Sequence, residues 1–244
     1  MRIDILSLFP EYFNGPFDVS MLKRARDNNL LDLNLINIRD FTKDKHGKVD
    51  DRPFGGGPGM VLSCQPLFDS IGSVKKENSH VIYLSPQGKP FNSSTAKRLA
   101  SLDHIIMICG HYEGIDQRVI DKEVDEEISI GDYILTNGCI AAVVLVDALS
   151  RFIPGVLGHP QAAYMDTFND DLFEGPQYTR PEIYEELSVP EVFVSGNHLL
   201  IENQRKQMAI LKMKKNRPDL YFKYLLEMKQ KKLKKVKNLA NKEN

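Results

Sequence analysis

Three short apolar runs, each ending in a loop rich in glycine and polar residues, constrain the fold of this chain most strongly. The runs begin at Val81 (VIYLSPQG), His104 (HIIMICGHYEG) and Ile128 (ISIGDYILTNG). Each has the length and apolar character of a buried strand. In open α/β sheets, ligands bind beyond the carboxyl ends of the strands. The sequence therefore predicts an α/β fold in which the three loops share one pocket.

Length and composition indicate a globular protein. The 244 residues, 42% of them hydrophobic, suffice for one sizeable core and a small second domain. No apolar run approaches the roughly 18 residues of a membrane span, and the charged start MRIDILSLFP does not have the pattern of a signal peptide. Cys64, Cys109 and Cys139 are single and far apart, which fits neither a disulfide framework nor a zinc site. We therefore expect a cytoplasmic protein with no membrane partner.

The net charge of −1 hides a strong asymmetry along the chain. Residues 1–203 hold 18 Lys and Arg against 30 Asp and Glu, whereas residues 204–244 hold 14 against 3. Such a basic block is either a solvated helix face or a nucleic-acid-binding arm. Composition alone leaves both interpretations open.

Local signals indicate where elements begin and end. Asn92 and Asn197 are placed to cap helices, Pro66 lies in a predicted first helical turn, and Pro218 opens a last helix with an apolar stripe. The run from Cys139 to Phe152 is too apolar for a surface helix, so it should pack into the sheet or against another subunit. After it comes a long aperiodic connection rich in proline and glycine.

The Gly-rich segment Arg52–Met60 invites a nucleotide-binding interpretation. Its GGGPGM core lacks the GxxxxGK[ST] spacing of a P-loop, and no GxGxxG follows the first strand. Neither a P-loop nor a dinucleotide-binding fold therefore has its required parts. Each glycine taken singly is explained by an ordinary tight turn.

Seven sequence blocks, taken in order and spacing, resemble the bacterial tRNA (guanine-N1)-methyltransferases, a family of knotted (SPOUT-class) methyltransferases. The resemblance runs from Met1 to about Leu220. The blocks are DDRPFGGGPGM from Asp50, YLSPQG from Tyr83, CGHYEGID from Cys109, SIGDYIL from Ser129, SRFIPGVLG from Ser150, QYTRP from Gln177 and SGNH from Ser195.

The resemblance implies a fold and an assembly. The expected α/β domain, residues 1–158, has a mostly parallel sheet and a deep trefoil knot, a threading that is nearly absent from other proteins. A flexible linker over residues 159–175, expected to become ordered on binding, precedes a small helical tRNA-binding domain with a basic tail over residues 176–244. The family's active site is shared between two chains, so a homodimer is expected.

The resemblance also implies S-adenosylmethionine as methyl donor and tRNA as substrate, methylated at N1 of guanosine 37 beside the anticodon. Magnesium stays open as a further requirement, with no residue assigned to it. An ordinary core position is the alternative for Tyr133 and Leu135. The expected cofactor-binding residues are Tyr83, Leu84, Ser85, Pro86, Gln87, Gly88, Gly110, Tyr112, Glu113, Ile130, Gly131, Asp132, Tyr133, Ile134, Leu135 and Gly138.

Two catalytic residues follow from the family pattern. Guanine N1 carries a proton at neutral pH, so methylation needs a base for that proton and a cation for the charge that develops on O6. The pattern assigns these roles to Asp166 in YMDTF and Arg151 in SRF. Partial burial would strengthen the carboxylate as a base. Residue chemistry alone does not distinguish Asp166 from Asp170 or Asp171.

Departures from the family pattern leave the fine cofactor contacts and any metal requirement open, but not the reaction class; two rival functions are to be tested separately. Asn137, Gly138 and Cys139 stand where the family commonly has Gly-Gly-Glu, and Met165 stands where an acid often precedes the catalytic aspartate. The rivals are a knotted methyltransferase acting on another RNA site and a non-catalytic RNA-binding assembly factor.

Overall fold

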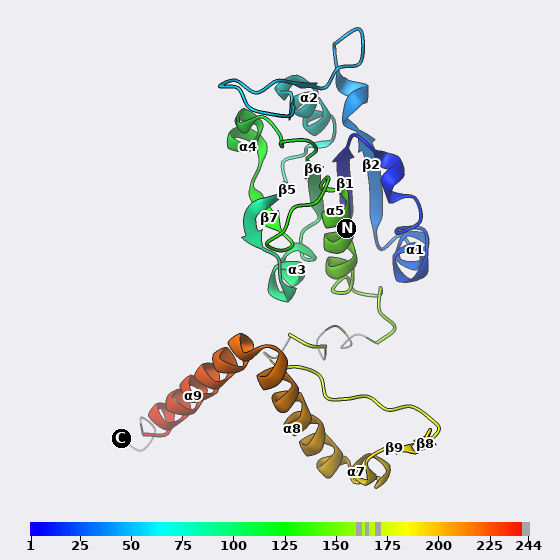
Figure 1. The fold of residues 1–244 in the computed structure, drawn as a ribbon, viewed down its shortest axis with the longest axis vertical. Coiled ribbons are helices and arrows are strands. Elements are labelled where there is room, and N and C mark those ends of the chain that lie inside the picture. The colour runs from blue at the N-terminus through cyan, green and yellow to red at the C-terminus, as the bar shows by residue number, and fades with distance from the viewer. Residues whose placement is uncertain (160–162, 164–165, 169–171, 241–244) are drawn as a thin grey trace. The chain divides into compact units, whose positions relative to one another are not determined.

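The computed structural model describes residues 1–159, 163, 166–168 and 172–240. It divides into two compact units, Met1–Pro160 and Gln161–Asn244, both drawn in Figure 1. The predicted linker over residues 159–175 lies partly outside the described residues. Met165, Asp170 and Asp171 lie wholly outside them.

A five-stranded, wholly parallel sheet forms the centre of the first unit, in the order β2-β1-β6-β5-β7. This confirms the predicted α/β class and the parallel sheet. The short strands β3 (Asp50–Asp51) and β4 (Val61–Leu62) pair separately, antiparallel, on either side of the Gly-rich loop. The sheet strands are β1 (Arg2–Ser7), β2 (Asp32–Asn37), β5 (Ser79–Pro90), β6 (His104–Cys109) and β7 (Glu126–Ser129).

Helices cover both faces of this sheet (Figure 1). Side chains alternate between faces along a strand, so Ile105 and Met107 of β6 enter one core cluster while Ile106 and Ile108 enter the other. The first cluster is closed by α1 (Ser20–Asp27), α3 (Ser93–Leu99) and α5 (Cys139–Ser150), with the 3-10 turn η1 (Pro10–Phe13). The second is closed by α2 (Cys64–Val74) and α4 (Gln117–Glu123), with η2 (Ile38–Phe41) nearby.

Polar side chains cap the amino-terminal ends of several helices. The Asn92 side chain accepts a hydrogen bond from Thr95 N (3.0 Å), and Asp116 does the same for Arg118 N (2.9 Å). Each satisfies a backbone donor that the first helical turn leaves without a partner. Pro66 lies in the first turn of α2, as predicted.

Helix α5 has two apolar faces with different surroundings. Leu145, Val146 and Leu149 are fully buried against the sheet. On the other face Ile140 and Val144, which lie one helical turn apart, are 43% and 40% exposed. The predicted burial of this apolar run is therefore complete on one face only.

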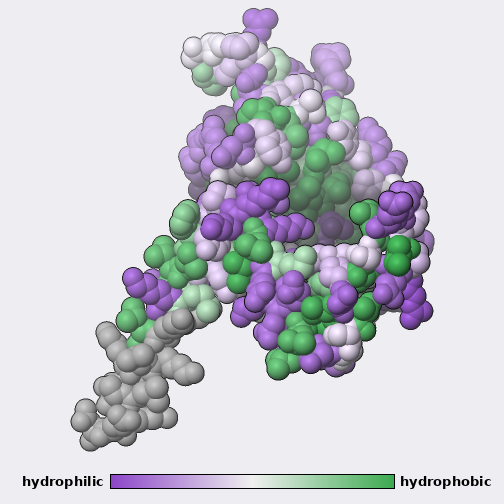
Figure 2. Space-filling view, turned by 60° about the horizontal axis from the view of Figure 1, so that its bottom comes forward, coloured by the Kyte–Doolittle hydropathy of each residue, from purple (hydrophilic) through white to green (hydrophobic). Residues whose placement is uncertain are grey.

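The second unit is mostly helical within its described part. Asn197 caps α8 (His198–Asn216) by accepting from Leu200 N (3.2 Å), and Pro218 opens α9 (Pro218–Ala240), both as predicted. The hairpin of β8 (Ile183–Tyr184) and β9 (Leu187–Ser188) and the short α7 (Glu191–Val194) precede them. Ala209, Met213 and Tyr224 are buried in this unit, and many other apolar side chains stay on its surface. Figure 2 shows hydrophobic residues among hydrophilic ones on this surface.

Among the residues that the structure describes, no helix combines the length and the apolar character that a membrane span requires.

Candidate functional site

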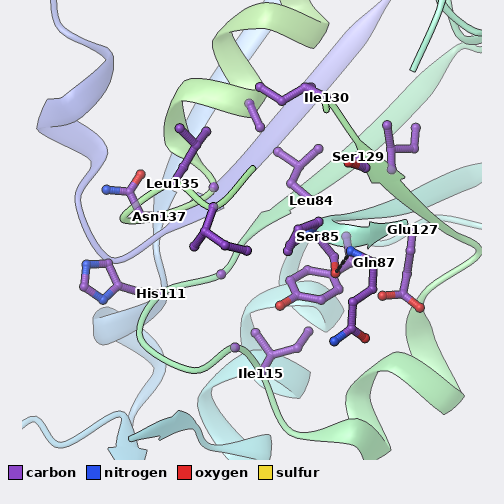
Figure 3. A pocket seen from close by; sticks show the side chains of 18 of the residues that line it. Leu84, Ser85, Gln87, His111, Ile115, Glu127, Ser129, Ile130, Leu135 and Asn137 are labelled. Atoms are coloured by element: carbon purple, nitrogen blue, oxygen red, sulfur yellow. Dashed lines mark hydrogen bonds between the residues drawn. The ribbon is translucent and has the colours of Figure 1, made fainter. Parts of the chain in front are cut away.

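A pocket of about 450 Å³ lies where β5, β6 and β7 end. Three loops build it, and they are the loops that follow the three apolar runs of the sequence (Figure 3). Because the strands are parallel, their carboxyl ends meet at one edge of the sheet. The predicted shared pocket is therefore present within the first unit.

Fourteen of the sixteen residues predicted to bind cofactor line this pocket. Gly88 and Asp132 do not. The predicted residues that line it are Tyr83, Leu84, Ser85, Pro86, Gln87, Gly110, Tyr112, Glu113, Ile130, Gly131, Tyr133, Ile134, Leu135 and Gly138.

Gly88 is needed for strand pairing rather than for the pocket wall. Strand β5 pairs with β7 in two stretches, with a register shift between Leu84 and Lys89. A Cβ added to Gly88 would collide with the backbone of Ile128 and Glu127 in β7. The absence of a side chain therefore lets the irregular part of β5 lie against its neighbour.

The loops after β6 and β7 are in direct contact. Gly138 N donates to Gly110 O (2.9 Å), and His111 pairs with Asn137 in an isolated antiparallel bridge. A Cβ on Gly138 would lie 2.9 Å from the Cα of Cys109. The chain that follows β7 therefore passes the end of β6 at a distance that only glycine allows.

The pocket has an apolar side and a polar side. In Figure 3, Leu84, Ile130 and Leu135 lie together, and Gln87 and Glu127 lie across from them. The mixture suits a ligand with an apolar body and a few polar groups.

The residues that line the pocket differ in exposure to solvent. Tyr83 is buried, and this burial together with the charge of Glu127 raises the pKa of its phenol. Tyr133 is 54% exposed and Leu135 38% exposed. The alternative that Tyr133 and Leu135 are ordinary core residues is therefore wrong.

Several residues that line the pocket were not predicted from the sequence. His111 lies inside the CGHYEGID block, and its Nδ1 is buried without a hydrogen-bond partner among the residues that the structure describes. Its ring packs on Phe9 and edge-on against Tyr112, with centroids 5.2 and 4.3 Å away. Glu127 was missed because β7 begins two residues before the apolar run at Ile128. Other missed residues are Gly114, Ile115, Gln117, Ile120, Ile128, Ser129, Thr136, Asn137 and Ala141.

Two buried cysteines meet beside the pocket. The Ser7 hydroxyl lies 3.2 Å from the Cys139 thiol at the start of α5. A hydrogen bond from Cys109, helped by Ser7, lowers the pKa of Cys139 to about 7 against the opposing effect of burial. Burial and the neighbouring Cys139 raise the pKa of Cys109 well above its usual value. The departure of this chain at Cys139 thus introduces a thiol that titrates near neutral pH.

The predicted catalytic Arg151 is not among the residues that line the pocket. Arg151 is exposed and caps the carboxyl end of α5, whereas Gly138 and Ala141 at the opposite end line the pocket. A helix rises about 1.5 Å per residue, so about 18 Å of α5 separates Arg151 from this end.

Asp166 belongs to the second unit and is partly buried. Among the described residues after it, Glu174 N donates to the Thr167 hydroxyl (3.1 Å) and Phe168 N donates to Leu172 O (3.3 Å).

The described part of the chain contains no group of three or more His, Cys, Asp or Glu side chains that could hold a metal ion. No magnesium site can therefore be assigned among the described residues.

Known proteins resemble this chain over most of its length. The family described as tRNA (Guanine-1)-methyltransferase TrmD matches residues 1–223. A tRNA (guanine-N(1)-)-methyltransferase of Protochlamydia amoebophila is 58% identical over 220 residues, which cover 90% of this chain and 99% of the relative. Relatives of the same name from Chlamydia pneumoniae and Carboxydothermus hydrogenoformans are 55% and 52% identical; the matches cover 92% and 90% of this chain. They cover 62% and 87% of those two relatives.

The family match includes the whole of the first unit and extends to the start of α9. It therefore includes every loop of the pocket and both predicted catalytic residues. With this match and relatives more than half identical, the chain belongs to the tRNA (guanine-1)-methyltransferase family.

Proposed function

We propose that this protein transfers a methyl group from S-adenosylmethionine to N1 of guanosine 37 in tRNA. The observation that carries the proposal is the pocket, which three loops build at the carboxyl edge of a parallel sheet inside a chain of this family. Because the substrate is a tRNA, we place the reaction in the cytoplasm.

The residues of the pocket fit S-adenosylmethionine. Its volume of about 450 Å³ lies within the usual range of small-molecule sites. Gly110, Gly131 and Gly138 line it without a side chain, so a ligand can approach the backbone closely there. Leu84 and Leu135 provide apolar surface for an adenine ring. When bound, the cofactor supplies an electrophilic methyl group.

The proposed base and cation act on the guanine itself. Asp166 would take the N1 proton, which frees the nitrogen lone pair to accept the methyl group. Arg151 stabilises the negative charge that develops on O6 as the proton leaves. The planar guanidinium suits this role because it can donate two parallel hydrogen bonds.

We propose a homodimer in which each pocket is completed by the partner chain. Within one chain, α5 carries Arg151 about 18 Å away from the pocket end of the helix. The exposed stripe of Ile140 and Val144 runs along the same helix toward Arg151. A second copy packed on this stripe would bury the apolar side chains and supply the missing arginine.

We propose a deep trefoil knot in the first unit. Strand β7 lies at the sheet edge, yet α5, which follows it, packs against β6 in the middle of the sheet. The connecting segment passes tightly beside the end of β6, where Gly138 contacts Gly110. This tight passage is the position at which a knotted chain would thread through its own loop.

We further propose that the second unit holds the tRNA through phosphates. Residues 204–244 have an excess of 11 positive charges, which is the electrostatic footprint of a nucleic-acid-binding segment. Not every cation is equally available, since Arg217 is paired with Asp219 (2.7 Å). The most available positions on α8 include Lys206, Lys212 and Lys215.

The direct test is methyl transfer from labelled S-adenosylmethionine. A tRNA transcript with guanosine 37 should be labelled, and the same transcript with adenosine 37 should not. Labelling of ribosomal RNA instead would favour a different RNA site. Binding of cofactor without any transfer would favour a non-catalytic factor.

Mixing two inactive variants tests the shared site. Arg151→Ala removes the proposed cation, and Gly138→Val fills the pocket edge against Cys109. Co-refolded chains should regain up to about a quarter of the activity, because about half of the randomly paired dimers contain one chain of each variant, and each of these keeps one intact site of its two. No recovery, with dimers present by light scattering, would show that each chain uses its own residues.

A further inference from the structure

A second hollow, of about 730 Å³, lies within the C-terminal unit. The segment from Pro176 to Glu182 forms one side of it, and α7 and α8 form the other. The function proposed above does not use this hollow. Its volume would accommodate a nucleotide-sized ligand.

Aromatic rings form the centre of this hollow. The rings of Tyr178 and Phe193 lie 5.1 Å apart between centroids, tilted by 48°. The guanidinium of Arg205 lies 5.8 Å from the centroid of Phe193 on the same wall. Phe193 is thereby held between two neighbours, whereas Tyr178 is 45% exposed. Tyr178 thus packs against Phe193 and still exposes part of its surface to a ligand.

Two arginines give the hollow its charge. Arg180 and Arg205 both line it and are exposed, and neither has an ion-pair or hydrogen-bond partner among the described residues. Glu182 is the one acidic residue of the lining. An exposed aromatic face beside unpaired guanidinium groups is the combination that binds single-stranded nucleic acid, through base stacking and phosphate contacts.

We propose that this hollow is a stacking site for one unpaired base of the tRNA, with Tyr178 as the platform and Arg180 and Arg205 against the flanking phosphates. A base inside a duplex has both faces covered, so only an unpaired nucleotide can stack here. The nucleotides beside guanosine 37 are unpaired because they belong to the anticodon loop. The inference rests on the proposed tRNA substrate and adds a contact outside the methyl-transfer pocket.

The absence of tryptophan from this chain allows a direct test. A Tyr178→Trp variant carries one tryptophan, in the hollow, and its emission can be excited selectively over that of the tyrosines. A Tyr184→Trp variant carries its tryptophan on the β8–β9 hairpin, where Tyr184 is 62% exposed and outside the lining. An anticodon stem-loop RNA should quench the first emission and leave the second unchanged. A blunt duplex of the same stem should quench neither. Equal quenching of both variants, or by both RNAs, would overturn the proposal.

Affinity measurements test the platform and the cation. Tyr178→Ala should weaken stem-loop binding on the order of tenfold, and Tyr178→Phe should restore it, because the ring and not the hydroxyl carries stacking. Arg205→Gln and Lys206→Gln each remove one charge from the same turn of α8, but only Arg205 lines the hollow. We expect both variants to lower the slope of log K against log salt by about one. In a second measurement the fluorescent base 2-aminopurine replaces one base of the loop, and only Arg205→Gln should lose the quenching that depends on the position of this probe.

Failure of this inference is distinguishable from failure of the proposed function. If the wild-type protein methylates tRNA but Tyr178→Ala binds the stem-loop as tightly as wild type, the stacking site is wrong and the methyltransferase stands. If the wild-type protein neither methylates nor binds tRNA, the proposed function fails and the stacking site fails with it.

Discussion

The carboxylate of Asp4 and the imidazole of His104 lie 2.7 Å apart at the amino-terminal edge of the sheet. Both side chains are almost completely buried. The Ser79 hydroxyl lies 2.7 Å from the other ring nitrogen of His104, and Arg2 binds the same carboxylate at 3.0 Å. This network joins the first residues of β1, β5 and β6 at the edge of the sheet opposite the pocket. It therefore stabilises the sheet without taking part in the site.

Replacing His104 by Leu should lower the free energy of unfolding by about 3 kcal/mol, because it leaves the buried Asp4 carboxylate with only one partner. Denaturant unfolding measures this loss. Asp4→Asn keeps an acceptor for His104 and should cost less. Cofactor affinity should stay unchanged in folded protein at low temperature, and a selective loss of affinity would contradict a purely structural role.

Replacing Gly138 by Ala should weaken cofactor binding and lower stability by about 1–3 kcal/mol. The backbone of Gly138 is compatible with alanine (φ −78°), so the cost comes from the 2.9 Å approach to Cys109. Gly72→Ala in α2 is the matched control, since its Cβ meets no atom within 4 Å. That variant should gain stability, by up to about 1 kcal/mol. Equal effects of the two substitutions would show that the contact between the loops is unimportant.

The ionisation of Cys139 should make stability depend on pH. Its pKa is lowered from 9.0 in the unfolded chain to about 7. Between these values the unfolded state binds more protons, so this residue's contribution to stability grows as pH rises from 7 to 9 and is lost below 7. Unfolding of wild type and Cys139→Ser should be compared across this range. A difference of stability that is constant with pH would show that Cys139 stays a thiol.

Replacing Asp166 by Asn should lower turnover about 10²- to 10⁴-fold and leave cofactor affinity unchanged, because an amide cannot take the N1 proton. Single-turnover methyl transfer measures the effect. Asp27→Asn on α1, which breaks an exposed ion pair with Lys23, serves as control and should be nearly silent. Turnover of Asp166→Asn within a few-fold of wild type would exclude this residue as the base.

Ending the chain after Gln230 should weaken tRNA binding and make it less sensitive to salt. The removed residues 231–244 contain six lysines and one acid, and they lie beyond the family match. The salt slope should fall by about one for each lysine in phosphate contact. Filter binding at several salt concentrations gives this slope. An unchanged slope would show that the lysines of the tail are solvated and do not contact phosphates.

Local features of this protein are determined by sequence alone. Asn92 and Asn197 begin helices because their side chains satisfy amides three residues away, within the same short segment. The three loops share an edge because apolar runs of strand length, joined by helices, pair in parallel. The caps need only information carried by neighbouring residues, and the shared edge follows from the general rule for parallel strands joined by helices, so the sequence predicted both.

Tertiary structure alone decided what depends on residues far apart in the chain. The register shift of β5 against β7 removes Gly88 from the pocket, and the bridge between His111 and Asn137 brings an unpredicted side chain into it. Cys109 and Cys139 meet because the chain after β7 returns to the end of β6. Residue spacing does not encode such contacts, since they arise only when the elements pack around one core and exclude water from it.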